Sequence, residues 1–249
     1  MKKYILALIL LSIYFNSFSS NLAEKHLPNH DQNSNKYRSV GKNVRNAHIV
    51  SLEYGRVISS FDYKNSDGEK LTNLQGSINN HLDVGWKMHF KTSKLYLLSG
   101  ISYNKYGAKG SDQALGNYYD WEVNYVGVRV GVGYEFFKTK SFFNFPYVNG
   151  NPGITFSIQA SVASDFLVKG TQKINNQVYN LIGVEQFDSP FLFALGGIGI
   201  NYYPTKEISI YLQYNGGKGF SIFSDSSDQE KLNYITHTIS LGIAISLPI

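Results

Sequence analysis

The sequence lacks cysteine altogether. A chain without cysteine has no disulfide framework, no cysteine for a lipid anchor behind a signal peptide, and neither a thiol nucleophile nor a thiolate metal ligand. These absences exclude the small disulfide-rich secreted proteins, the lipoproteins and the cysteine-dependent enzymes and metal sites.

Long hydrophobic runs are also lacking. Beyond the first 19 residues, no stretch approaches the roughly 18–20 consecutive apolar residues of a transmembrane helix. The formal net charge is +5, and losing Lys2 and Lys3 with the N-terminal segment would leave 5 − 2 = +3. So small an excess gives no reason to expect nucleic acid as a partner.

Aromatic residues, in contrast, are abundant, with 19 Tyr and 16 Phe beside 23 Gly. Tyrosine and phenylalanine favour strands over helices because they fit a pleated, half-buried surface. The composition therefore favours an all-β protein.

The first 19 residues are typical of a secretory signal peptide. Lys2 and Lys3 precede an apolar run, Tyr4–Phe15, and small residues follow at Ser17 and Ser19. We expect cleavage after Ser19, the alternative being an uncleaved N-terminal anchor. Residues 20–46 are polar and without periodicity, which predicts a flexible periplasmic segment, and residues 47–249 form the remaining domain.

Period-two alternation recurs through this domain. In Ser77–Phe90, for example, Leu82, Val84 and other apolar residues alternate with polar ones, a pattern that helical spacing would scatter. Eight such segments predict strands: 48–59, 77–90, 94–106, 126–136, 153–168, 190–203, 207–216 and 239–249.

The connections between these segments alternate in length. Residues 91–93 and 204–206 are short, whereas 62–73, 107–117, 169–189 and 217–233 are long and polar. Short periplasmic turns and long external loops are typical of a membrane barrel. The exception, 138–152, is long and aromatic, and could hide a short helix or a hairpin. We therefore predict an eight-stranded antiparallel up-and-down transmembrane β-barrel, with ten strands as an open alternative.

The two faces of the strands indicate which side meets lipid. One face is rich in Ile, Val, Leu, Tyr and Phe, and the other carries Gly, Ser, Asn and charges. A soluble calycin-like barrel for an apolar ligand would need an apolar lumen, whereas a barrel in lipid is apolar outside and polar inside. Aromatic residues near strand ends, such as Trp121 in 118–121, are expected to form interfacial girdles.

Three segments carry a family resemblance: the N-terminal MKKYILALILL, Tyr125–Phe137 (YVGVRVGVGYEFF) and Thr238–Pro248 (TISLGIAISLP). With them the chain resembles the outer-membrane β-barrel family of Bacteroidota that includes PorT-like proteins and, more distantly, small barrels of the OmpA and OmpX type. The resemblance implies export, insertion by the barrel assembly machinery and no cofactor, but no single activity. One departure is the ending Leu247-Pro248-Ile249, where proteobacterial barrels usually end in an aromatic residue.

Charged residues on the inward phase are the candidate site. They are Glu53, Asp83, Lys87, Arg129 and Glu135, accompanied by His81 and His89. Buried charges must pair, so we expect a lumen charge network that either fills the barrel or gates a pore or proton site. Arg129 is the expected central cation, because its planar fork can hold two carboxylates.

A second candidate is His237, near Thr236, Thr238 and Ser240, which would suit a lipid-modifying enzyme with a Ser–His pair. Its phase, shared with Ile235 and Ile239, instead predicts that it faces lipid headgroups. His81 and His89 lie too far apart along one strand to share a metal ion. We expect no catalytic residue, metal or cofactor.

The sequence as a whole predicts a non-enzymatic outer-membrane barrel, exported by a cleaved signal peptide, that anchors external loops. Its role would be in envelope integrity, surface interaction or secretion-system assembly. Its expected partners are outer-membrane lipids, the barrel assembly machinery during insertion, and envelope or secretion-system proteins. A narrow channel for small solutes and a lipid-modifying enzyme are the alternatives.

Overall fold

The computed structural model describes residues 48–64, 73–90, 94–111, 116–140, 153–205, 207–221 and 231–247. The expected signal peptide, the polar segment up to residue 46 and most of the 138–152 connection lie outside these ranges. Among the described residues, no helix is long and apolar enough to cross a membrane.

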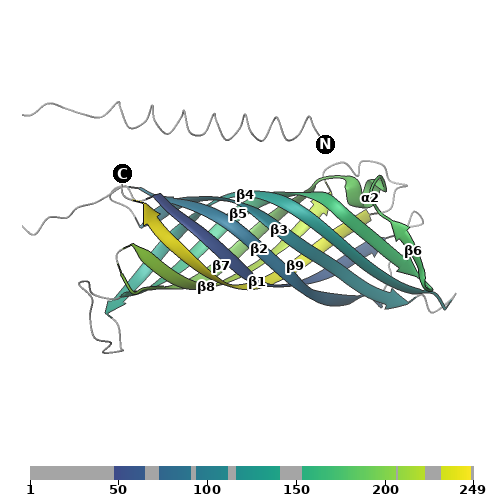
Figure 1. The fold of residues 1–249 in the computed structure, drawn as a ribbon, viewed down its shortest axis with the longest axis horizontal. Coiled ribbons are helices and arrows are strands. Elements are labelled where there is room, and N and C mark those ends of the chain that lie inside the picture. Colours follow the sequence, from purple (N-terminus) through teal and green to yellow (C-terminus); the bar gives the residue numbers. More distant parts are fainter. Residues whose placement is uncertain are drawn as a thin grey trace, which may run out of the picture. The chain divides into compact units, whose positions relative to one another are not determined.

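The described chain is almost entirely antiparallel β-structure (Figure 1). The elements in chain order are β1 (His48–Lys64), β2 (Gln75–His89), β3 (Leu95–Ser111), β4 (Tyr118–Lys140), β5 (Gly153–Ile174), β6 (Gln177–Asn180), the one-turn helix α2 (Glu185–Asp188), β7 (Phe191–Tyr203), β8 (Ile208–Ser221) and β9 (Lys231–Leu247).

Eight of the strands close into a ring. When the short β6 is left aside, each strand pairs with the next one along the chain, so that β5 pairs with β7. The last strand, β9, pairs with the first, β1, and closes the ring. The prediction of an all-β, antiparallel, up-and-down barrel is therefore confirmed. β6 is a ninth, short strand that pairs only with the far end of β5, over 171–174.

The strands are inclined to the barrel axis. Following paired residues once around the ring from Ser51 leads back to Phe61, ten residues further along β1, by way of Gly85, Gly100, Arg129, Ala163, Phe193, Gly219 and Tyr234. A fixed stagger of this kind is what closure requires, and it tilts strands by about 35–45°. An eight-stranded barrel with this tilt has an interior that side chains can fill.

The two ends of the barrel differ. At the end that we call the turn end, His48 pairs with Leu247 and a few residues, Pro204–Glu207, join β7 to β8. At the opposite end, the loop end, the β5–β6 hairpin and α2 lie beyond the ring (Figure 1).

Several strands run further toward the loop end than predicted. Residues 107–111, 118–124, 169–174, 217–221 and 231–236 were expected in loops or outside strands, but they continue β3, β4, β5, β8 and β9. The prediction was wrong there because it followed apolar alternation. Strands pair through the backbone, so polar residues beyond the apolar belt extend the same ladders.

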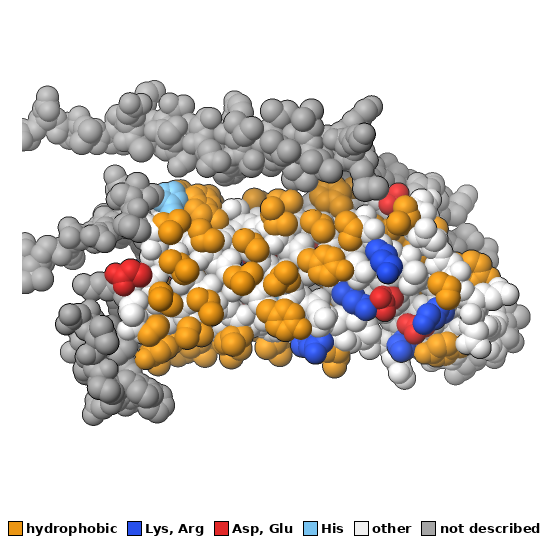
Figure 2. All heavy atoms as spheres, in the orientation of Figure 1, with side chains coloured by type: hydrophobic (Ala, Val, Ile, Leu, Met, Phe, Trp, Pro, Cys, Tyr) orange, Lys and Arg blue, Asp and Glu red, His pale blue; other side chains and the backbone are white. Residues whose placement is uncertain are grey.

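The outer wall carries an apolar belt. Large exposed side chains such as Leu52, Ile101, Val132 and Leu241 cover it from the turn end through the middle, while Lys, Arg, Asp and Glu gather toward the loop end (Figure 2). Exposed tyrosines, Tyr54, Tyr103, Tyr134 and Tyr214, lie on the same wall. This polarity, apolar outside and polar inside, is that of a barrel that spans a membrane with its strands.

Candidate functional site

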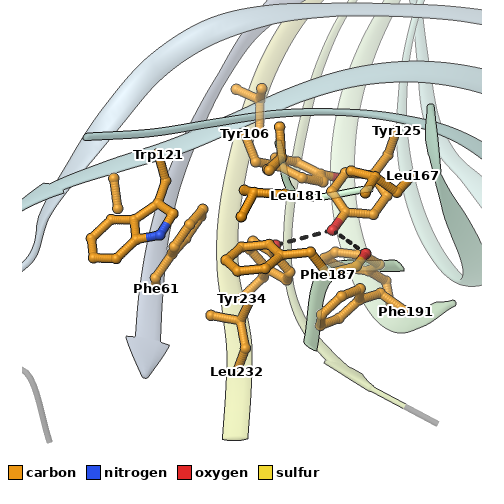
Figure 3. Packing of buried hydrophobic residues seen from close by; sticks show 14 of the residues in the cluster. Phe61, Tyr106, Trp121, Tyr125, Leu167, Leu181, Phe187, Phe191, Leu232 and Tyr234 are labelled. Carbon is orange, nitrogen blue, oxygen red and sulfur yellow. Dashed lines mark hydrogen bonds between the residues drawn. The ribbon is translucent and has the colours of Figure 1, made fainter. Parts of the chain in front are cut away.

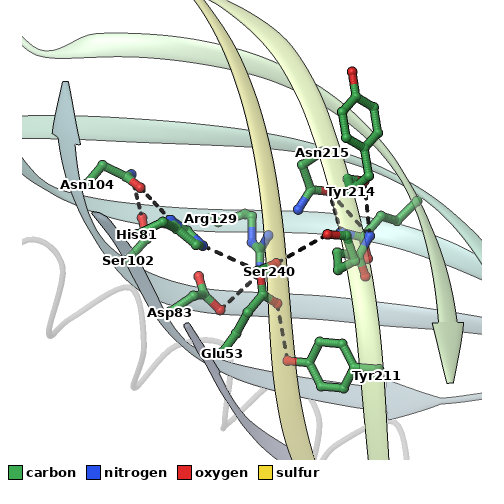
Figure 4. A network of polar contacts seen from close by, with 12 residues as sticks. Glu53, His81, Asp83, Ser102, Asn104, Arg129, Tyr211, Tyr214, Asn215 and Ser240 are labelled. Carbon is green, nitrogen blue, oxygen red and sulfur yellow. Dashed lines mark hydrogen bonds and ion pairs between the residues drawn. The ribbon is translucent and has the colours of Figure 1, made fainter. Parts of the chain in front are cut away.

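The lumen holds the predicted charges because strand alternation turns every second side chain inward. Glu53 on β1, Asp83 on β2 and Arg129 on β4 are all buried, while their chain neighbours Leu52, Val84 and Val130 are exposed. Figure 4 shows these side chains converging from strands far apart in the chain.

Arg129 pairs with one carboxylate. Its Nη2 atom lies 3.0 Å from Oδ1 of Asp83, and Asp83 is almost wholly buried, at 2% exposure. We expected that the Arg129 fork could hold two carboxylates. In the part of the chain that the structure describes, it forms an ion pair with one carboxylate, that of Asp83. A charge-assisted bond of this length is among the stronger interactions available in a low-dielectric interior.

Glu53 is held by other groups. Tyr211 donates a hydrogen bond to its Oε2 over 3.2 Å, Ser240 donates a short one to Oε1, and the Nε2 atom of His81 lies 3.4 Å from Oε1. These three partners come from β8, β9 and β2, so the carboxylate ties four strands together. The sequence had not suggested Tyr211 or Ser240 as partners of an inward acid.

The network continues from His81 toward the loop end. His81 Nδ1 lies 2.6 Å from Asn104 Oδ1, and Asn104 Nδ2 donates to Asp165 Oδ2 over 3.3 Å. Tyr106 also donates to this carboxylate, over 2.8 Å. Asp165 is 1% exposed and was missed in the sequence, although it shares the inward phase of Gln159 and Ser161 and could have been found by extending that phase.

In the described part of the chain, neither Lys87 nor Glu135 is hydrogen-bonded or ion-paired to a member of this network. The Lys87 ammonium lies 4.8 Å from the ring centre of Tyr211 and 5.5 Å from that of Tyr96, within the range of cation–π attraction. Glu135 Oε1 lies 3.4 Å from His89 Nε2 and accepts a hydrogen bond from Tyr203 over 3.1 Å. The predicted set thus divides into a central group and a second group toward the turn end.

Little space remains among these side chains. A cavity of about 10 Å³, room for about one water molecule, lies between Glu53, Lys87, Arg129, Gln159 and Gln213. Two lumen glycines contribute to the tight filling: a Cβ on Gly242 would lie 2.2 Å from Cζ of Tyr211, and one on Gly133 would lie 2.1 Å from Cζ of Tyr96. Glycine at these positions admits the neighbouring tyrosine rings.

Toward the loop end the lumen contents change to an aromatic cluster. We use that name for the buried residues Phe61, Tyr106, Trp121, Tyr125, Phe187, Phe191, Phe193 and Tyr234, which pack with Val57, Val123, Leu167, Leu181 and Leu232 (Figure 3). Ring centres lie as close as 4.6 Å, between Phe191 and Tyr234. The expectation that Trp121 belongs to an interfacial girdle is wrong, because its side chain points inward and is 5% exposed.

The helix α2 packs against this cluster through Phe187. Tyr125 donates a hydrogen bond to the backbone carbonyl of Phe187 over 3.0 Å, and its hydroxyl lies 3.2 Å from that of Tyr234 (Figure 3). Phe187 and Leu181 come from the connection between β5 and β7, so a segment outside the ring supplies part of the filling. The loop end of the lumen is thus packed with apolar side chains.

The alternative site around His237 is not assembled. His237 points outward, whereas Thr236, Thr238 and Ser240 are buried on the lumen side, and Ser240 is occupied by Glu53. Alternation along one strand keeps such neighbours on opposite faces. Within the described ranges there is also no group of three or more residues that could hold a metal ion.

No protein-family model matches the sequence, and no curated protein matches it significantly. Solved structures do match. Neisserial surface protein A is 10% identical, with 80% of this chain and 96% of that chain covered and a TM-score of 0.41. OprG of Pseudomonas aeruginosa is 9% identical, with 82% of this chain and 98% of that chain covered and a TM-score of 0.46. Ail of Yersinia pestis is 13% identical, with 80% of this chain and 98% of that chain covered and a TM-score of 0.37. At these identities the likeness concerns the barrel fold alone.

Proposed function

We propose that this chain is a non-enzymatic outer-membrane β-barrel whose lumen is closed and whose loop end is presented outside the cell. The observation that carries the proposal is the aromatic cluster, which fills the lumen toward the loop end with buried side chains. A plugged barrel serves as an anchor, because solutes have no open path through it.

The outer wall supports a membrane location. Exposed Ile, Val, Leu and Tyr side chains surround the ring, and the ring has no open edge where backbone groups would be left unsatisfied in hydrocarbon. Together with the N-terminal segment that resembles a signal peptide, this supports export, cleavage of the signal and insertion by the barrel assembly machinery. We extend the proposal to membership of the PorT-like barrels of Bacteroidota.

The loop end supports a surface role. The hairpin of β5 and β6 and the segment behind it expose Val178, Tyr179 and Ile182 beyond the ring. Exposed apolar side chains on such a projection suit contact with another envelope protein. Envelope integrity, surface interaction and secretion-system assembly all fit such an anchored contact surface.

The test of closure is conductance in planar bilayers. We expect the wild-type protein to stay silent, and the double variant F191A/Y234A to open discrete steps, because it removes two rings from the centre of the aromatic cluster. A matched control is F220A, which removes a ring that is exposed on β8. We expect F220A to remain silent.

Stable openings of the wild-type protein would contradict the proposal and favour a narrow channel. A mobility shift between boiled and unboiled samples, which a closed barrel shows, verifies that each variant is folded. An altered lipid A mass spectrum in a deletion strain would instead favour a lipid-modifying enzyme.

A further inference from the structure

We propose that three outward-facing residues, Arg56, Lys218 and His237, bind the phosphate of an anionic outer-leaflet lipid against the barrel wall. The inference rests on the proposed membrane location and adds to it a ligand and a place. It starts from basic side chains that lie beside exposed apolar side chains on the outer wall.

The three residues lie on the adjacent strands β1, β9 and β8. Arg56 pairs with Ile239, two residues from His237, and Lys218 pairs with Ile235, two residues from His237 on the other side. Diagonal neighbours of this kind are about 7–8 Å apart between Cα atoms. Because the strands are inclined, this diagonal runs roughly around the barrel, and the three side chains lie at similar depth.

Within the described ranges, the charges of Arg56 and Lys218 are not compensated by a carboxylate, and His237 forms no ion pair with one. The lysines on β3 differ: Lys105 lies 2.8 Å from Glu122, and Lys109 lies 3.5 Å from Asp120. Counting only residues that the structure describes, the cluster is thus a local positive excess, whereas these two lysines on β3 are balanced by acids on β4.

Apolar side chains surround the cluster on the wall. Ile58, Ile235 and Ile239 are each more than 40% exposed beside it. An unpaired Arg or Lys on a lipid-facing wall is strongly unfavourable at the bilayer midplane and costs little at the interface. The cluster is therefore best placed at the headgroup level, where an anion can compensate it.

The polar neighbours leave donors available. Arg56 donates to Asn80 Oδ1 through Nη1, and this hydrogen bond does not use the Nη2 and Nε donors. Tyr214 projects away from the lumen group (Figure 4), and its hydroxyl lies 2.7 Å from Nδ1 of His237. When this hydroxyl donates, the imidazole carries its proton on Nε2 and can donate it to a ligand.

A phosphate oxyanion fits this donor set. The guanidinium fork recognises phosphate with two parallel hydrogen bonds, and an ammonium adds a point charge. One strand further from the cluster the wall is bare. Gly216 pairs with His237 and lies under the Tyr214 hydroxyl, but at Gly196, which pairs with Gly216, an added Cβ would meet nothing within 4 Å. An acyl chain of the same lipid can lie against this stretch.

The experiment compares lipid retention by native mass spectrometry of the full-length protein. The cluster variant is R56Q/K218Q, and the matched control is K105Q/K109Q, which removes the same charge from the carboxylate-paired lysines. The probes are diphosphoryl lipid A, phosphatidylglycerol, zwitterionic phosphatidylethanolamine and inorganic phosphate.

We expect the cluster variant to retain lipid A at least tenfold less well than the wild type, and the control to change less than twofold. An equal loss of phosphatidylglycerol would extend the site to phospholipid phosphate. Equal lipid retention in all three proteins, or binding of inorganic phosphate alone, would overturn the inference. The boiling-dependent mobility shift separates the two proposals: if it is absent in the wild type, the membrane barrel itself fails.

Discussion

The middle of the lumen and its loop end are built on the same inward phase but with opposite chemistry. In the middle, Glu53, Asp83 and Arg129 are held by ion pairs and hydrogen bonds. At the loop end, rings such as those of Phe191 and Tyr234 are held by packing. The comparison shows that alternation alone specifies which residues point inward, while the contents of each level depend on what the neighbouring strands contribute.

The two regions should also fail differently. A buried ion pair contributes little by itself, yet removing one partner is costly because the other charge remains unpaired. A packed aromatic cluster loses stability in proportion to the volume removed. Variants can therefore separate a lumen that depends on pairing from one that depends on packing.

The largest effect is expected for R129M. The substitution leaves Asp83 buried without its cation, which should lower the free energy of unfolding by about 3–5 kcal/mol. The change is measured by urea unfolding in lipid vesicles, with the boiling-dependent mobility shift as the readout of the folded fraction. The double variant R129M/D83N should recover much of the loss, and unchanged stability of R129M would show that the middle of the lumen does not depend on pairing.

An intermediate effect is expected for G242V. The new side chain would collide with the Tyr211 ring and displace its hydroxyl from Glu53, costing about 1–3 kcal/mol. G196V is the matched control, because its added atoms project into open space on the outer wall. We expect G196V to lie within about 0.5 kcal/mol of the wild type in the same unfolding assay, and equal losses in both variants would argue against a tightly filled lumen.

The smallest effect is expected for Y125F at the loop end. It removes the hydroxyl that donates to Phe187 but keeps the ring, so the loss should be about 1 kcal/mol. Hydrogen exchange should rise selectively in the segment around α2, with little change in β1 and β2. Faster exchange throughout the barrel would mean that the hydroxyl supports the whole lumen.

Much of the fold followed from sequence. Alternation in Ser77–Phe90 and in the last strand predicted the right faces, and the two short connections placed one end of the barrel. The strand ends at the loop end could not be predicted in this way. In 118–124 and 169–174, polar residues remain in β4 and β5 because backbone pairing continues where the contrast between the two faces fades.

The candidate site was predicted by residue but not by contact. Glu53, Asp83 and Arg129 were identified as inward charges, and their phase was right. Asp165 was overlooked, and Trp121 was assigned to the wrong face. Both lie toward the loop end. There the sequence alone does not tell whether an aromatic or acidic side chain lies at the membrane interface, in solvent or in the lumen, because this depends on what the facing strands contribute.

The sequence by itself determined the alternation of each strand, and with it a barrel that is apolar outside and polar inside. Only the tertiary structure decided that Arg129 meets Asp83, 46 positions away, that Glu53 meets Tyr211 and Ser240, and that Lys218, His237 and Arg56 lie along one diagonal of the wall. The physical reason is closure: contacts across the lumen and around the wall depend on strand stagger, which is a property of the whole ring and not of any single strand.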